Sequence, residues 1–321
     1  MRESTRNLIK PVLALVGIAA VVGACVGAGA SPTLPGSDKP SSSPAPSSTA
    51  SAAPSSTAGR PISHPAGSKD LVFRLDIDGG LVAPGTNLGH LPIISVYGDG
   101  TVVTPGPQLM IYPPPARPSL AARHLSEAGL QRLLAAAEAA GLLGKDADLP
   151  ANGIADAQTA SFTVVANGGV HHVTAYALIE SQNTDGLDPA TIVARAELLA
   201  FTQQLAQLPT LVGADQITDL GAYSADRLRL IVSPMPVTNP APSQITEPAI
   251  AWPLATPLAS FGAGMAGTSN GRRCGTVEGT DLALLNHLID KATEISPWTS
   301  GGTSWSMTIR PLLPDEAGCP G

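Results

Sequence analysis

The histidines and the closely spaced carboxylates of this 321-residue chain are its candidates for metal binding and acid–base chemistry. His171 and His172 are adjacent on an expected strand, so their side chains should point to opposite faces and cannot readily share one metal ion. Asp76 and Asp78 lie on the same side of a strand end and could bind calcium. Two glycines follow them, however, where a calcium-binding loop needs further oxygen ligands. We therefore expect no metal site and no cofactor.

Two further groups of residues have the types found in carbohydrate-binding and glycosidase sites. Glu278 and Asp281 could act as a glycosidase pair, but they stand at an expected helix start, where the helix dipole favours carboxylates in any case. Trp252, Trp298 and Trp305 could stack against a sugar. The chain has only four Phe, four Tyr and three Trp, so the tryptophans are more expected as anchors of the core.

Sequence motifs of catalysis give little support to an enzyme. Residues 262–267 match the dinucleotide-binding pattern GxGxxG, but no strand–helix–strand unit surrounds them, so a loop is expected. The phosphate-binding loop, the zinc-protease HExxH and the penicillin-binding SxxK patterns are absent. A Ser-His-Asp site stays open, because its members are assembled in space. An exported hydrolase acting on envelope polymer or peptide is therefore the alternative function.

The first 25 residues carry a targeting pattern. Basic positions precede an apolar run at 12–22, which ends in the small-residue site Val22-Gly23-Ala24-Cys25. The run is shorter than the roughly 20 residues needed to cross a bilayer. The pattern resembles a bacterial lipoprotein signal, and this resemblance implies cleavage of residues 1–24 and attachment of acyl chains, such as palmitate, to Cys25. We expect the protein on the extracytoplasmic face of the cell membrane, anchored by lipid at Cys25.

The composition of residues 25–68 is that of a tether. Residues 31–68 contain twelve Ser, eight Pro and no aromatic residue, so this segment cannot bury enough apolar surface to offset its ordering entropy. We expect residues 25–68 to be disordered. Without residues 1–24, which carry a net charge of +2, the formal charge falls from −7 to −9. No Lys/Arg cluster compensates for this acidity, so no nucleic-acid partner is expected.

The two cysteines beyond the anchor are expected to pair. An exported chain that keeps an even number of cysteines usually oxidises them, which predicts a disulfide between Cys274 and Cys319. Closing this loop should stabilise the fold by about 4 kcal/mol if the gain is entropic. The alternative is a reactive thiol at Cys274 beside Arg272 and Arg273, which would need that cysteine unpaired.

The rest of the chain alternates strand and helix signals. Gly98-Asp99-Gly100 and Asn167-Gly168-Gly169 each separate two strand-like runs and so predict β-hairpins, because such turns need positive φ values. The expected strands are residues 71–77, 92–97, 101–104, 161–166, 170–177, 226–233 and 304–312. The expected first and last residues of the helices are Ser126 and Gly141, Asp188 and Pro209, and Thr280 and Pro297.

These signals predict an α+β fold in which hairpins form antiparallel sheet and helices pack on one face. We expect an α+β domain at 69–212 and a second α+β half or domain at 213–321 that holds the disulfide. The apolar stripe of the third helix repeats that of the first helix 152 positions later. The two halves could therefore be related by duplication, although any two amphipathic helices share such a stripe.

Two family resemblances accompany this reading. The Gly79-Gly80 pair after the first strand, the run Phe162-Thr163-Val164-Val165 leading to His172-Val173, and the two Leu-striped helices make residues 71–208 resemble emfourin-type bacterial protease inhibitors. This resemblance implies an inhibitor-like domain but transfers no inhibitory residue. The whole chain also resembles uncharacterised lipoproteins of high-GC bacteria that end in Arg310-Pro311-Leu312-Leu313-Pro314 and a cysteine, which implies no activity.

The most suggestive surface feature is the stretch from Pro105 to Pro118, in which Leu109, Met110, Ile111 and Tyr112 stand between prolines. Proline lowers the entropy lost on binding, so these four residues could form a preorganised partner-binding loop. They could equally fold back as a cover over the core. We expect a membrane-anchored extracytoplasmic lipoprotein that binds a protein or cell-envelope ligand, without chemistry of its own.

Overall fold

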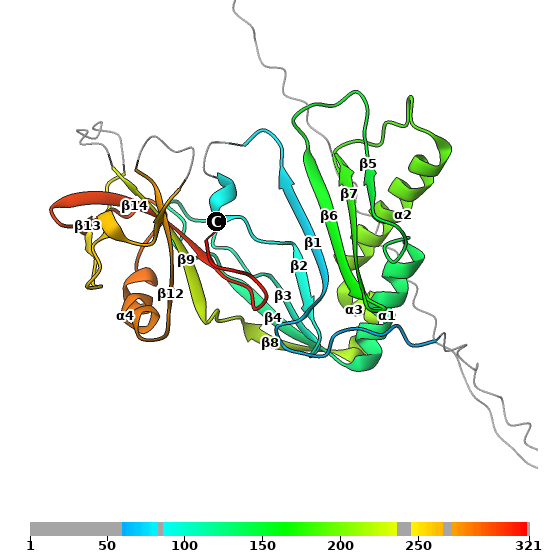
Figure 1. The fold of residues 1–321 in the computed structure, drawn as a ribbon, viewed down its shortest axis with the longest axis horizontal. Helices are drawn as coiled ribbons and strands as arrows, with labels where there is room; N and C mark the ends of the chain where they lie inside the picture. The colour runs from blue at the N-terminus through cyan, green and yellow to red at the C-terminus, as the bar shows by residue number, and fades with distance from the viewer. Residues whose placement is uncertain (1–59, 83–85, 236–244, 266–270, 320–321) are drawn as a thin grey trace, which may run out of the picture. The chain divides into compact units, whose positions relative to one another are not determined.

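The computed structural model describes residues 60–82, 86–235, 245–265 and 271–319, and Thr57–Gly321 form one compact unit. The signal segment, Cys25 and most of the expected tether lie outside the described residues. Two mostly antiparallel sheets and four α-helices give the described part the α+β fold that the sequence predicts (Figure 1). The folded part begins before residue 69, because Ile62 is buried and its N–H donates to Gln131 Oε1 at 2.8 Å.

The larger sheet has eight strands in the order β5-β7-β6-β1-β2-β3-β4-β8. Its strands are β1 (Leu71–Gly79), β2 (Ile94–Tyr97), β3 (Thr101–Pro105), β4 (Leu120–Leu125), β5 (Ala147–Leu149), β6 (Gln158–Ala166), β7 (Gly169–Tyr176) and β8 (Ile217–Ala222). Neighbours pair antiparallel except β5 and β7. Both predicted hairpins are confirmed: φ is positive at Gly100 in the β2–β3 turn and at Asn167 and Gly168 in the β6–β7 turn.

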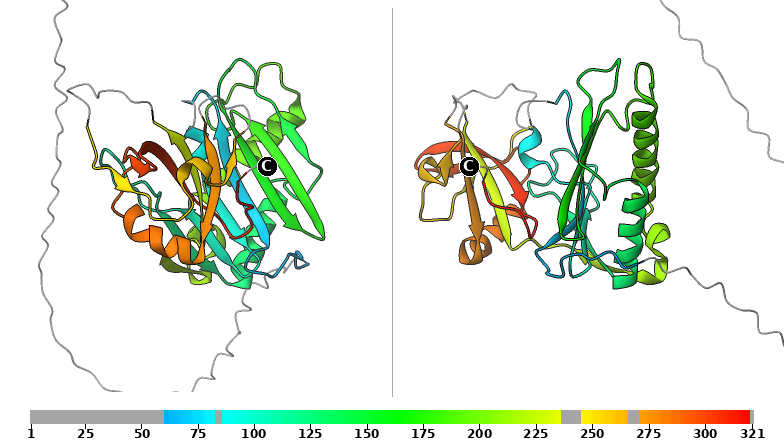
Figure 2. Two further views of the ribbon diagram at one scale, coloured as in Figure 1. Left: turned by 60° about the vertical axis from the view of Figure 1, so that its left-hand side comes forward. Right: turned by 45° about the vertical axis from the view of Figure 1, so that its right-hand side comes forward.

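Helices α1 (Glu127–Ala139), α2 (Pro189–Leu205) and α3 (Leu208–Val212) cover one face of the larger sheet (Figure 2). The ring of Phe73 in β1 meets that of Phe201 in α2 edge-on, with 5.7 Å between the centroids. The predicted N-caps are confirmed, since Ser126 Oγ accepts from the Gly129 N–H and Asp188 accepts from two N–H groups. Local sequence signals therefore set where α1 and α2 begin.

Three helix boundaries differ from the expectation. Helix α2 ends at Leu205, and Pro209 stands in the first turn of α3, where its missing N–H leaves no hydrogen bond unmade. The helix expected from Thr280 is α4 (Gly279–Ile289), whose N-cap is Glu278 and which ends before Pro297. Gly279 has a φ of 54°, which suits glycine and allows the helix to start directly after a strand.

The smaller sheet has six strands in the order β10-β13-β14-β9-β12-β11, and α4 packs on it. Its strands are β9 (Arg227–Pro234), β10 (Ile250–Ala251), β11 (Ala263–Gly264), β12 (Arg273–Glu278), β13 (Trp298–Ser300) and β14 (Thr303–Pro311). Trp298 and Trp305 are buried in its core, and Trp252 packs edge-on against Trp298 with 6.1 Å between the rings. The tryptophans serve the core, as expected.

The chain passes from the larger to the smaller sheet between β8 and β9. Because β8 follows residue 212 yet pairs with β4, the sheets do not divide the chain at the expected boundary of 212/213. For the duplication considered from the sequence, each sheet has a central strand, a helix and a hairpin, but the strand that precedes the helix occupies a different place in each sheet. The strand before α1 is β4, three strands from β1, whereas the strand before α4 is β12, directly beside β9.

The C-terminal tail, residues 312–319, follows β14 and ends at the predicted disulfide between Cys274 and Cys319, which is confirmed. Leu313 of this tail is buried in a small apolar cluster with Tyr97 of β2 and Leu120 of β4. The tail of the smaller sheet thus packs against the larger sheet. The connections also include the 3-10 helices η1 (Thr86–Gly89), η2 (Ala214–Gln216) and η3 (Leu258–Ser260).

Candidate functional site

The connection between β3 and β4 carries the longest exposed apolar run of the described chain. Its residues Leu109, Met110, Ile111 and Tyr112, here called the apolar tip, are 65%, 99%, 58% and 69% exposed. A cover over the core would bury these side chains. The exposure therefore favours availability for binding over the covering role, and the identity of what binds stays a prediction.

The first half of this connection is fixed to the larger sheet. The Gly106 N–H donates to the Ser119 carbonyl at 2.8 Å, and Gln108 Nε2 donates to the carbonyls of Gly106 and Ser119 at 3.0 and 3.1 Å. A Cβ at position 106 would lie 2.6 Å from Ser119 Oγ and 3.0 Å from the Leu120 carbonyl carbon. Glycine therefore allows the two sides of the connection to approach each other just before the apolar tip.

The second half of the connection is fixed to the end of α4, on the smaller sheet. Backbone hydrogen bonds run from the Glu294 N–H to the Pro114 carbonyl at 3.0 Å and from the Ala116 N–H to the Ala292 carbonyl at 2.9 Å. Arg117 binds Asn286 of α4 at 2.8 Å and Asp290, the C-cap of that helix. The apolar tip is thus presented between two anchored ends.

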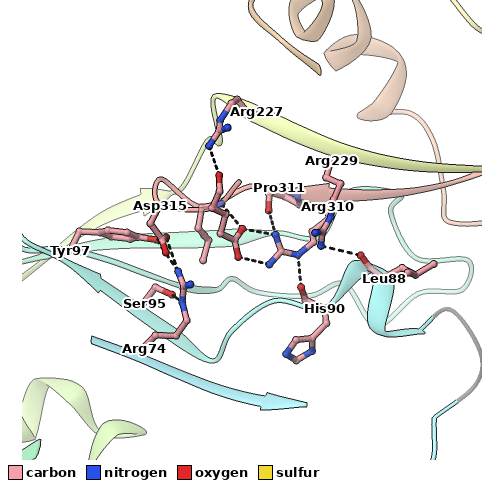
Figure 3. A network of polar contacts seen from close by, with 12 residues as sticks. Arg74, Leu88, His90, Ser95, Tyr97, Arg227, Arg229, Arg310, Pro311 and Asp315 are labelled. Atoms are coloured by element: carbon pink, nitrogen blue, oxygen red, sulfur yellow. Dashed lines mark hydrogen bonds and ion pairs between the residues drawn. The ribbon is translucent and has the colours of Figure 1, made fainter. Parts of the chain in front are cut away.

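A network of polar contacts joins the C-terminal tail to the larger sheet (Figure 3). Asp315 Oδ1 accepts from Arg74 Nη2 and from the Tyr97 hydroxyl, each at 2.8 Å. Arg74 Nε also donates to Ser95 Oγ at 2.9 Å. Burial, followed by the hydrogen bond to Asp315, raises the pKa of Tyr97 well above its usual range. Tyr97 therefore stays neutral and acts as a hydrogen-bond donor.

The same tail is joined to the smaller sheet by Glu316. Arg310 of β14 donates to both carboxylate oxygens of Glu316, at 2.5 and 2.6 Å, and the Leu313 N–H donates to one of them at 2.9 Å. Arg227 Nη2 of β9 donates to the Glu316 carbonyl at 2.7 Å. Arg310 Nε also reaches the His90 carbonyl at 2.5 Å (Figure 3). The two acidic residues of the tail therefore bind one sheet each.

Arg229, another arginine of this region, has no carboxylate partner among the described residues. Arg229 of β9 makes a long contact from Nη2 to the Leu88 carbonyl, 3.5 Å, and its Nε is buried without a hydrogen bond. Burial, and then the charge of Arg310, lowers the pKa of Arg229. Asp315 and Glu316 are both held by arginines from the sheets, so the contacts of this network join parts of the fold.

The residues singled out for metal binding do not come together. Asp76 is paired with His90, whose Nε2 lies 2.5 Å from Asp76 Oδ1, and this hydrogen bond raises the pKa of His90. His171 and His172 contact different partners, the Gly144 carbonyl and Thr163 Oγ1. Across the described ranges, no group of three His, Cys, Asp or Glu side chains could hold a metal ion.

The two glycosidase candidates, Glu278 and Asp281, do not line one cleft. Glu278 lines a cleft of about 370 Å³ together with Lys69, Tyr223, Asp226 and Arg227, but Asp281 does not line it. A second cleft of about 340 Å³ shares Tyr223 and is lined otherwise by residues 117–120, 222–225, 228 and 311. Burial raises the pKa of Tyr223. Both clefts are open at the junction of the sheets.

Within the described ranges, no hydrogen bond joins a histidine to a serine, and the one histidine–hydroxyl contact is the 3.3 Å contact of His172 Nδ1 with Thr163 Oγ1. Residues 262–265 of the GxGxxG pattern form a turn and β11, and the remaining two lie outside the described residues. In those same described ranges, no helix is long and apolar enough to cross a membrane.

Sequence reasoning missed the polar network of the tail. The sequence signal for this network is the alternation of Arg227 and Arg229 with apolar residues in β9. Such alternation usually indicates a side of a strand that faces solvent. Neither a family model, nor a curated protein, nor a solved structure matches this chain. The resemblances to emfourin-type inhibitors and to bacterial lipoproteins therefore stay predictions.

Proposed function

We propose that this protein is an extracytoplasmic lipoprotein, anchored to the cell membrane at Cys25, whose ectodomain binds a protein or cell-envelope ligand. The observation that supports the binding role is the apolar tip, four adjacent apolar side chains that are exposed and held between two anchored ends. Soluble proteins seldom expose such a run without a binding role. Side chains of this kind dominate interfaces once they are desolvated.

The binding role is tested by replacing Met110, Ile111 and Tyr112 together with Ser. Capture of envelope components by the ectodomain should fall, while the melting temperature should hardly change, because these side chains are already exposed. The matched control replaces Val170, Val193 and Leu220 with Ser, which removes three exposed apolar side chains elsewhere.

The outcome distinguishes the two readings of the tip. Buried side chains contribute about 1.5–3 kcal/mol each, so a covering role would show as a large drop in melting temperature. Such a drop, or capture equal to that of the wild type, would contradict a binding role.

The anchor is tested by Cys25→Ser. Its thiol is the expected acceptor of the lipid, so the variant should leave the detergent-extracted membrane fraction, as shown by fractionation and immunoblotting. Retention in that fraction at the wild-type level would refute lipid attachment at Cys25.

A further inference from the structure

We propose that the ligand of the apolar tip is the lipid surface of the membrane in which Cys25 is anchored, an inference that rests on the function proposed above. The side chains of Leu109, Met110, Ile111 and Tyr112 would enter the boundary between headgroups and acyl chains. The anchored ends of the connection would keep the sheets in water. The ectodomain would then contact the membrane at two points, the lipid on Cys25 and the tip.

The size of the tip favours a lipid surface over a protein partner. The fractional exposures of its four side chains correspond to an apolar area on the order of 500 Å², whereas a standard protein interface buries about 800 Å² on each partner. Met110 is 99% exposed, so the tip protrudes. A fluid lipid layer accommodates a protrusion without a matching pocket.

The charge of the segment favours the same partner. Residues 105–116 contain no Asp, Glu, Lys, Arg or His, so no ionised group has to leave water when the tip inserts. Tyr112 is of a residue type that is enriched where membranes meet water. Because the segment is uncharged, its binding should depend little on ionic strength.

The backbone of the tip sets the depth of insertion. No hydrogen bond within the described chain involves the N–H or C=O groups of residues 109–112. Such groups cost several kcal/mol each if they enter hydrocarbon without a partner. At the interface these groups keep water while the side chains reach the acyl boundary, the depth at which the apolar faces of interfacial helices lie.

The length of the chain before the folded part allows this contact. Residues 26–59 separate Cys25 from the first described residue, and these 34 residues span at most about 115 Å. A short tether of this kind holds the tip near the membrane at an effective concentration in the millimolar range. Weak intrinsic binding of four side chains therefore suffices.

The test measures binding of the unlipidated chain, residues 26–321, to phosphatidylcholine vesicles by co-sedimentation. We expect a bound fraction that rises with lipid and changes less than about two-fold between about 0.1 and about 0.5 M NaCl. Replacing Met110, Ile111 and Tyr112 with Ser should lower the partition coefficient about ten-fold or more, and the control triple variant at 170, 193 and 220 should leave it unchanged. Met110→Trp should give a blue-shifted emission that brominated phosphatidylcholine quenches.

Each alternative result has a defined meaning. Absence of vesicle binding, loss of binding in high salt, equal losses in both triple variants, or an unquenched Met110→Trp would overturn the lipid inference. If vesicles fail to bind while the Ser variant still loses capture of an envelope protein, the proposed function holds with a protein as the ligand. If neither vesicle binding nor capture depends on the tip, both proposals fall.

Discussion

Replacing Asp315 with Ala measures how strongly the C-terminal tail holds the larger sheet. Asp315 accepts hydrogen bonds from Arg74 and Tyr97, and the side chains of Arg74 and Asp315 are 16% and 20% exposed. Both hydrogen bonds end on the charged carboxylate of Asp315, and a hydrogen bond to a charged group contributes about 1.5–3 kcal/mol. Because the pair is partly exposed, the sum is reduced by solvent screening, and the expected loss in the free energy of unfolding is about 2–3 kcal/mol.

The assay is urea unfolding of the unlipidated chain, with Glu197→Ala as the matched control because Glu197 is an exposed residue of α2. A double-mutant cycle with Arg74→Met should give a coupling energy of about 1–2 kcal/mol. If the free energy of unfolding of Asp315→Ala lies within about 0.5 kcal/mol of that of the control, Asp315 behaves as an ordinary surface residue. The tail then does not hold the sheets together.

The disulfide and His90 give the remaining predictions. Replacing Cys274 and Cys319 with Ser should lower the free energy of unfolding by about 4 kcal/mol if the entropic account of the 45-residue separation holds, and dithiothreitol should do the same to the wild type but not to the variant. Alkylation of both cysteines in native, unreduced protein would contradict the bridge. The hydrogen bond to Asp76 raises the pKa of His90 in the folded protein. The protonated His90 therefore stabilises the folded state fully below the unfolded pKa of about 6.5, and this stabilisation is lost as the pH rises through the higher folded pKa. We expect the difference in the free energy of unfolding between wild type and His90→Asn to shrink as the pH rises from about 5.5 to about 8.5 in urea unfolding. A difference that stays constant with pH would refute this linkage.

The elements that the sequence predicts correctly are those with local causes. The turns at Gly100 and Gly168 and the caps at Ser126 and Asp188 each follow from residues within one turn or hairpin. The end of α2 differs from the expectation because Pro209 can follow the end of one helix or stand in the first turn of another.

The junction of the sheets lies beyond such reasoning. The contact between Arg74 and Asp315 joins residues 241 positions apart, and the one between Arg310 and the His90 carbonyl joins residues 220 apart. Nothing local marks these residues as partners, and a charged residue in a strand reads as solvent-exposed until the opposing surface is known. The sequence indicates the apolar tip because prolines flank it closely on both sides. Its exposure depends on how both ends of the connection are anchored, which no local pattern indicates.

The position of residues 312–319 sets the order in which the junction of the sheets can form during synthesis. Asp315 and Glu316 follow the strands of both sheets in the sequence, yet they supply the carboxylates for Arg74 in one sheet and Arg310 in the other. Until they arrive, these two arginines lack their ion-pair partners, so the sheets cannot complete their junction. A chain cut before residue 315 would therefore keep the strands of both sheets but lack the two carboxylates that join them.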